Sequence, residues 1–178
     1  PGTPVQDAID AASPGDTLAV DLHGHGITGL GWSHTCAITF ADGAFTDLIK
    51  FLPLHATVAS RAGAEAWLKR LAKMDDAMRD ERRRFEVDVQ SGAIPPRTVV
   101  QRTLDKARQL RPTIPREHVL TQHFTESLAQ IADIPEDEIA RLTARAAELV
   151  GGDIRKEYDA LISLLEATLA KAPIEPGV

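Results

Sequence analysis

The chain has 178 residues, of which 43% are hydrophobic and 26% are charged, a balance ordinary for a globular protein that excludes disorder of the whole chain. Its net charge of −6 and the lack of a dense Lys/Arg stripe argue against a nucleic-acid or anionic-membrane surface, because binding a polyanion requires neutralisation of its phosphates. Apolar runs stay well short of the roughly 20 residues of a membrane helix, and the single cysteine, Cys36, demands no oxidising compartment, so we expect a soluble chain, cytoplasmic rather than secreted.

The first fifty residues differ in composition from the rest of the chain. They hold seven of the 12 glycines and a single basic residue, Lys50. A short helix is predicted before Ser13-Pro14-Gly15, and the apolar runs "TLAV" and "TCAITF" favour strands. The Asp42-Gly43 pair predicts a hairpin that leads into "AFTDLIK". We therefore expect a Gly-rich mixed strand and loop segment at 1–50 and a separate helical domain at 51–178.

Candidate metal ligands lie in the stretch "AVDLHGHG". Asp21, His23 and His25 occupy alternate positions, and alternate residues of a strand point to the same side. This stretch is similar to the first barrel strand of metal-dependent amidohydrolases, in which a D-x-H-x-H strand presents both histidines to a divalent metal. His34 is a further candidate donor. The resemblance implies a small amidohydrolase-like protein that binds a metal such as zinc.

Two other interpretations of this stretch stay open. An amidohydrolase barrel requires eight strands with ligands from later strands, and the later sequence is helical. The stretch is then a Gly-rich loop with exposed histidines, or a loop that cradles a ligand, although it lacks the Gly-Lys-Ser/Thr of a phosphate loop. Cys36 lies in an apolar run and is interpreted as a small core residue.

Five amphipathic helices are predicted after residue 51. An apolar stripe from about Ala62 to Val89 predicts one long helix, in which the basic run 82–84 is interpreted as a solvated face. Four shorter helices follow. Three of them are predicted from apolar stripes, which are Val100, Leu104, Ala107 and Leu110; Leu120, Phe124, Leu128 and Ile131; and Ile154, Tyr158, Leu161, Leu165 and Leu169. The helix before the last one is predicted to start at Pro135 and to stop at Gly151-Gly152. Helices of this kind bury their stripes against one another, so the fold class is mainly α, an irregular antiparallel bundle of about five helices.

The helical part contains three familiar sequence features. They are the "W-L-x-R-L" spacing of Trp67, Leu68, Arg70 and Leu71, the "G-x-x-P-P-R-x-V-V" turn of Gly92, Pro95, Pro96, Arg97, Val99 and Val100, and a final helix with Tyr158 before Gly177 and Val178. Over 51–178 the chain resembles the bacterial domain of unknown function 885 family. One departure is Lys156-Glu157-Tyr158, where the family usually has "P-A-Y".

This resemblance implies a larger protein with a His-Glu-x-x-His helix further along the chain, of the kind found in zinc-dependent, metallopeptidase-like hydrolases. The present sequence has no such motif, and His118 and His123 are five residues apart, about 140° around a helix. With no initiator methionine and an end at "EPGV", the chain is interpreted as a fragment, a non-catalytic helical region of such a hydrolase. In that interpretation Arg97 has a capping or interface role.

A third interpretation is a helical protein-interaction module. Its apolar stripes would pair with the remainder of a larger chain or with a second copy of this one.

The metal hypothesis predicts near-stoichiometric metal in the purified chain. His23→Ala should lose most of that metal, because a site with so few histidine ligands cannot hold its metal once one ligand is removed. Elemental analysis of both proteins measures the difference. A metal-free wild-type chain, or equal metal content in the variant, removes the hypothesis.

Overall fold

The computed structural model describes residues 38–174, and this part of the chain contains helices and no strand. The expected mainly α class and the irregular antiparallel bundle are confirmed. The Gly-rich segment expected at the N-terminus falls largely on residues 1–37, which lie outside the described residues. The division into two domains therefore stays a prediction.

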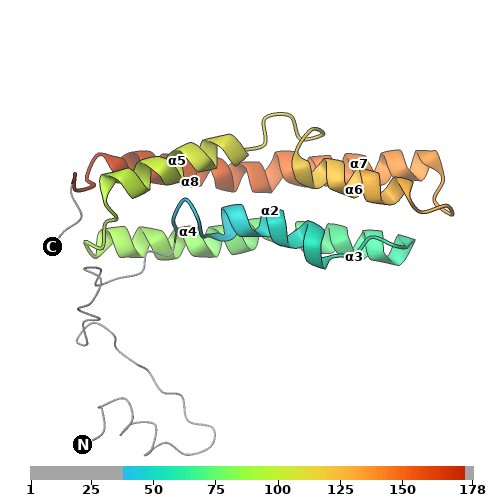
Figure 1. The fold of residues 1–178 in the computed structure, drawn as a ribbon, viewed down its shortest axis with the longest axis horizontal. Coiled ribbons are helices and arrows are strands. Elements are labelled where there is room, and N and C mark those ends of the chain that lie inside the picture. Colours follow the sequence, from blue (N-terminus) through green and yellow to red (C-terminus); the bar gives the residue numbers. More distant parts are fainter. Residues whose placement is uncertain (1–37, 175–178) are drawn as a thin grey trace, which may run out of the picture. The chain divides into compact units, whose positions relative to one another are not determined.

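The helices form two layers, which Figure 1 shows one above the other. The lower layer consists of α2 (Ala44–His55), α3 (Arg61–Leu71) and α4 (Met74–Gln90). The upper layer consists of α5 (Arg97–Leu110), α6 (Val119–Ala129), α7 (Glu136–Leu149), the π-helical turn η2 (Val150–Ile154) and α8 (Arg155–Leu169). Within the upper layer α5 packs beside α8 and α6 beside α7, while α4 contacts α8 and α3 contacts α7 across the layers.

The apolar stripes meet between the layers and bury the largest side chains of the core. Trp67 of α3 stacks on Phe124 of α6, with ring centroids 4.4 Å apart. Phe45 of α2 meets Tyr158 of α8 edge to face at 6.4 Å, and the Tyr158 hydroxyl donates a hydrogen bond to the Phe45 carbonyl. Aromatic pairs of this kind stabilise by about 1 kcal/mol beyond the burial of their area.

Four of the five predicted helices are confirmed as α5 to α8. The long helix predicted from about Ala62 to Val89 is wrong in one respect, because the chain breaks it into α3 and α4 at Ala72 and Lys73. The apolar stripe continues across the break, since both Leu71 and Met74 are buried. Neither Gly nor Pro marks the break, so the sequence carries no signal for it.

The hairpin predicted at Asp42-Gly43 is wrong. Gly43 instead precedes α2, and its φ of 138° lies in a region that side chains rarely adopt. The Asp47 carboxylate accepts a hydrogen bond from the Gly43 N–H, as a residue in the first turn of a helix often does. The same glycine that would suit a hairpin therefore precedes a helix, and α2 begins at Ala44.

The joint between α7 and α8 passes through Gly151 and Gly152. Helical hydrogen bonding continues through η2, and Gly152 leaves helical geometry with φ −91° and ψ −108°. The expected stop thus takes the form of a kink at Gly152, which separates α7 from α8. Gly151 allows a close approach of the segment between α5 and α6, because a Cβ at this position would lie 2.6 Å from Pro115 Cγ.

Gly151→Ala should lower the free energy of unfolding by about 1–3 kcal/mol, the usual range for an overpacked site. Chemical denaturation followed by circular dichroism measures the loss. The same substitution in a Pro115→Ala background should cost less, because the clashing ring atoms are gone. An equal loss in both backgrounds would show that the Pro115 contact is not the cause.

Candidate functional site

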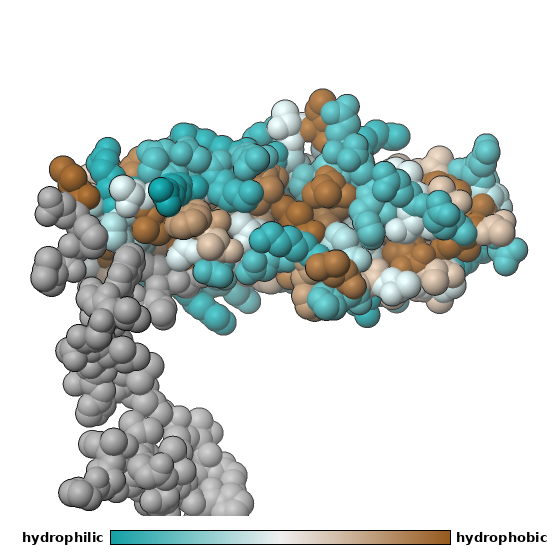
Figure 2. Space-filling view, viewed as in Figure 1, coloured by the Kyte–Doolittle hydropathy of each residue, from teal (hydrophilic) through white to brown (hydrophobic). Residues whose placement is uncertain are grey.

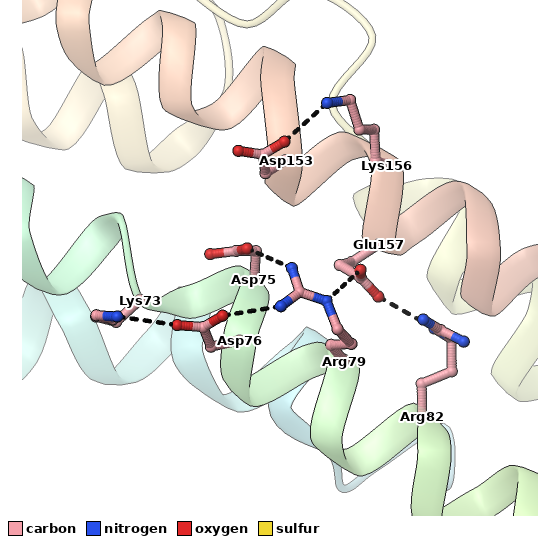
Figure 3. A network of polar contacts seen from close by, with 8 residues as sticks. All are labelled: Lys73, Asp75, Asp76, Arg79, Arg82, Asp153, Lys156 and Glu157. Atoms are coloured by element: carbon pink, nitrogen blue, oxygen red, sulfur yellow. Dashed lines mark hydrogen bonds and ion pairs between the residues drawn. The ribbon is translucent and has the colours of Figure 1, made fainter.

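A cluster of charged side chains joins α4 to α8, and we call it the α4–α8 charge cluster. Figure 3 shows its eight residues, which are Lys73, Asp75, Asp76, Arg79, Arg82, Asp153, Lys156 and Glu157. All of them lie on α4, on η2, on α8 or directly before α4. The cluster therefore brings together residues from the two layers that are distant in sequence.

Glu157 is the centre of this cluster. It is only 9% exposed, and its carboxylate lies between two guanidinium groups. Arg79 Nε donates to Oε1 at 3.0 Å, and Arg82 Nε donates to Oε2 at 3.1 Å. A carboxylate removed from water is costly unless it is paired and hydrogen-bonded, so these two arginines make the buried position of Glu157 possible.

Arg79 also binds two carboxylates of its own helix. Its Nη1 donates to Asp76 at 2.9 Å and its Nη2 to Asp75 at 2.7 Å. The hydrogen bond to Glu157, followed by those to the two aspartates, raises the pKa of the Arg79 guanidinium. Hydrogen bonds from Lys73 and Arg79 lower the pKa of Asp76. Arg79 and Asp76 thus stabilise each other's charged forms.

The cluster is neutral as a whole, since it contains four acids and four bases. Each of its carboxylates already accepts from a cation, so the arrangement favours structure over proton transfer. Across residues 38–174, no group of three or more His, Cys, Asp or Glu side chains is placed to hold a metal ion. The described residues therefore do not fit a zinc site.

The metal ligands predicted from the sequence cannot be placed. Asp21, His23, His25 and His34 lie outside the described residues, so their site stays a prediction. Cys36 also lies outside them.

His118 and His123, the pair five residues apart in the sequence, make separate contacts. His118 directly precedes α6, and its Nδ1 accepts a hydrogen bond from the Leu120 N–H at 3.4 Å. Burial lowers the pKa of the His118 imidazole. His123 lies inside α6 and is half-buried. His118 thus acts as a helix cap for α6.

Arg97 has the capping role expected of it. Its guanidinium Nη1 donates to the Leu169 carbonyl at the end of α8, at 3.2 Å, and its backbone N–H donates to the Pro173 carbonyl at 2.8 Å. Cations near a helix C-terminus satisfy its free carbonyls. Pro95 and Pro96 are buried beside it, so the Pro-Pro-Arg turn joins the start of α5 to the end of α8.

Sequence reasoning missed the α4–α8 charge cluster, although one signal was present. Glu157 lies three residues after Ile154 and four before Leu161, on the apolar stripe of α8. A carboxylate at such a position indicates a buried ion pair. The basic run 82–84 was interpreted as solvated, and this is wrong for Arg82, which binds Glu157.

A second partly buried carboxyl, that of Glu81, also joins two helices. It projects from α4 and accepts a hydrogen bond from the Ala44 N–H in the first turn of α2. Burial raises the pKa of the Glu81 carboxyl, and the Ala44 hydrogen bond opposes this shift. Glu81 thus supplies a cap for α2 from another helix.

Apolar side chains are also exposed at several places on the described surface, and Figure 2 shows brown patches among the hydrophilic residues on one face. On α2, Phe51 and Leu54 are exposed, and the Phe51 ring contacts the His55 ring at 4.4 Å. Such side chains suit an interaction surface. The interaction-module hypothesis stays a prediction. No helix in residues 38–174 is both long and apolar enough to cross a membrane.

A family model described as "Bacterial protein of unknown function (DUF885)" matches residues 6–176. The chain belongs to this family. The resemblance expected over 51–178 is thus confirmed, and the DUF885 match extends further towards the N-terminus than expected. It includes the stretch with His23 and His25.

The comparison with solved structures supports the same fold. The chain is similar to a structure titled "The crystal structure of the putative lipoprotein from Colwellia psychrerythraea", with a TM-score of 0.71 and 14% sequence identity. The match covers 75% of this DUF885 chain and 23% of that chain. At this identity the likeness shows the fold alone. No curated protein matches the chain.

Glu157→Gln should lower the free energy of unfolding by about 3 kcal/mol, because both arginines lose the charge of their carboxylate partner in a mostly buried position. Urea denaturation followed by circular dichroism measures this loss. Glu166→Gln is the matched control, since Glu166 lies on the same helix and its pair with Arg108 is half exposed. The control should lose less than about 1 kcal/mol. Equal losses would show that Glu157 has no special role in joining the layers.

Proposed function

We propose that this chain is a non-catalytic helical region of a larger, zinc-dependent hydrolase of the metallopeptidase kind. The observation that carries the proposal is the unequal coverage in the structural comparison. Three quarters of this chain match less than a quarter of the Colwellia protein. In that protein, the helical array is one portion of a much longer chain.

The polar contacts of the described residues support a structural role. The α4–α8 charge cluster is neutral and its groups bind one another. Arg97 caps α8, and Glu81 caps α2. These groups hold helices together. A hydrolase needs instead a nucleophile or an activated water beside a group that can accept its proton.

Zinc would be bound by residues of the longer protein. The family resemblance implies a His-Glu-x-x-His helix, in which two histidines bind the metal and the glutamate activates a water molecule. Residues 38–174 would then position that part of the protein. The substrate class implied is a peptide or amide.

The test compares two proteins. The 178-residue chain, loaded with one equivalent of zinc, should hydrolyse a mixture of fluorogenic peptide and amide substrates no faster than buffer. A longer protein, translated from the encoding frame through the His-Glu-x-x-His helix, should show turnover that a chelator abolishes. Its variant with the motif Glu changed to Gln should bind zinc and lose most of its activity.

Two outcomes would contradict the proposal. One is chelator-sensitive turnover by the 178-residue chain. The other is an encoding frame without a His-Glu-x-x-His helix. In the longer protein, Glu166→Gln is the control, because its half-exposed ion pair lies on α8 in the helical region and should leave turnover unchanged.

A further inference from the structure

The outer face of α2 carries two large exposed apolar side chains side by side. Phe51 is 54% exposed and Leu54 is 76% exposed, and they lie three residues apart, which makes them neighbours on one face of the helix. Among residues 38–174, α2 is the only helix with two such side chains. Single exposed apolar residues are ordinary on a protein surface, whereas adjacent ones indicate a contact surface.

Polar groups of opposite character border this apolar pair along α2. Asp47 lies four residues before Phe51 and His55 lies four after it, and both are exposed. Residues four apart are neighbours on a helix, so these three form one row along its surface. Glu81 of α4 adds a second carboxylate at the start of α2, where it accepts from the Ala44 N–H. The row thus runs from an acidic end to an imidazole end.

A row in this order is complementary to a second copy of itself. When a two-fold axis passes beside Phe51, two copies of α2 run antiparallel, and position 47 of one meets position 55 of the other. Helices most commonly pack through such rows of residues four apart. An imidazole can donate to a carboxylate in either of its charge states, and the Asp47 carboxylate, bonded to the Gly43 N–H, has further acceptor sites.

Net charge also favours this face for a contact between copies. The chain carries a net charge of −6, so two copies repel each other over most of their surface. Within α2 the charged side chains are Asp47 and Lys50, which cancel. Two copies that meet through α2 therefore bring together a locally balanced surface.

We propose that α2 is a self-association surface, on which two copies of this chain pair antiparallel. Phe51 and Leu54 lie at the centre of the contact, and Asp47 lies beside the partner's His55. A helix of 12 residues is about 18 Å long, so the contact is smaller than the about 1,200–2,000 Å² of a stable interface. The dimer is therefore weak, with a dissociation constant in the micromolar range. This pairing is independent of any hydrolase activity.

Sedimentation velocity of the 178-residue chain tests the proposal. The wild-type chain should shift from monomer to dimer between about 5 and 500 μM, a range that brackets a micromolar dissociation constant. Leu54→Glu should raise this constant at least about tenfold, because it places a charge among the apolar side chains of the contact. Val87→Glu is the matched control, since Val87 is 62% exposed on α4, and it should leave the constant unchanged. Circular dichroism checks that each variant is folded.

Charge changes at positions 47 and 55 test the antiparallel arrangement. His55→Glu should weaken pairing, because it places a carboxylate beside the partner's Asp47. Asp47→Asn should weaken pairing in the wild-type chain, since an amide accepts a weaker hydrogen bond than a carboxylate. In the His55→Glu background the same change should strengthen pairing, because it removes the repulsion between like charges. Asp137→Asn, at an exposed acid of α7, controls for the change in net charge.

Three results would overturn the proposal. The first is a strict monomer across the whole concentration range, which would leave the α2 surface to another occupant, such as the remainder of a longer protein. The second is a dimer that Leu54→Glu does not weaken. The third is an effect of Asp47→Asn that has the same sign in both backgrounds, because positions 47 and 55 would then not meet. Within one chain these two positions are about 12 Å apart along the helix, so they do not meet there.

Discussion

The two layers depend on one buried carboxylate that must keep its partners. Glu157 lies where an apolar side chain would be expected, and Arg79 and Arg82 reach it from the opposite layer and pair with its carboxylate. Two donors on one helix fix both the distance and the register of α4 against α8. Tyr158 follows Glu157 directly and makes the next contact between layers, with Phe45 of α2. Two ion pairs and one aromatic pair thus join α8 to α4 and α2.

Most of the helices could be predicted from the sequence because each has local signals. The stripes of α5 to α8 are regular, and a proline directly precedes α5 and α7. Two features could not be predicted locally. The break at Ala72 and Lys73 has no Gly or Pro, and the positive φ of Gly43 suits a hairpin and a helix start equally well. At Gly43 a contact with a distant helix accompanies the helix start, because the Ala44 N–H that follows it donates to Glu81 of α4.

The candidate site was harder to predict because its partners are distant in the chain. Arg97 was interpreted as a capping or interface residue, and the structure shows the capping bond, from its guanidinium to the end of α8. Glu157 appeared only as a departure from the "P-A-Y" pattern of the family. The structure gives that departure a physical meaning, because glutamate at the alanine position meets two arginines 75 and 78 residues away in the sequence. Glu157 and the two arginines meet only in the folded chain, so their pairing could not be predicted from the sequence.

The bonds between Arg97 and the end of α8 have a mechanical consequence. A helix whose last turn is free unwinds from its end when the chain beyond it is pulled. Here the Arg97 N–H holds the Pro173 carbonyl, and its guanidinium holds the Leu169 carbonyl. Tension on the chain after Pro173 would therefore pass into the start of α5 before α8 begins to unwind. Because α5 and α8 lie side by side, that tension would be shared along their whole contact rather than borne one turn at a time.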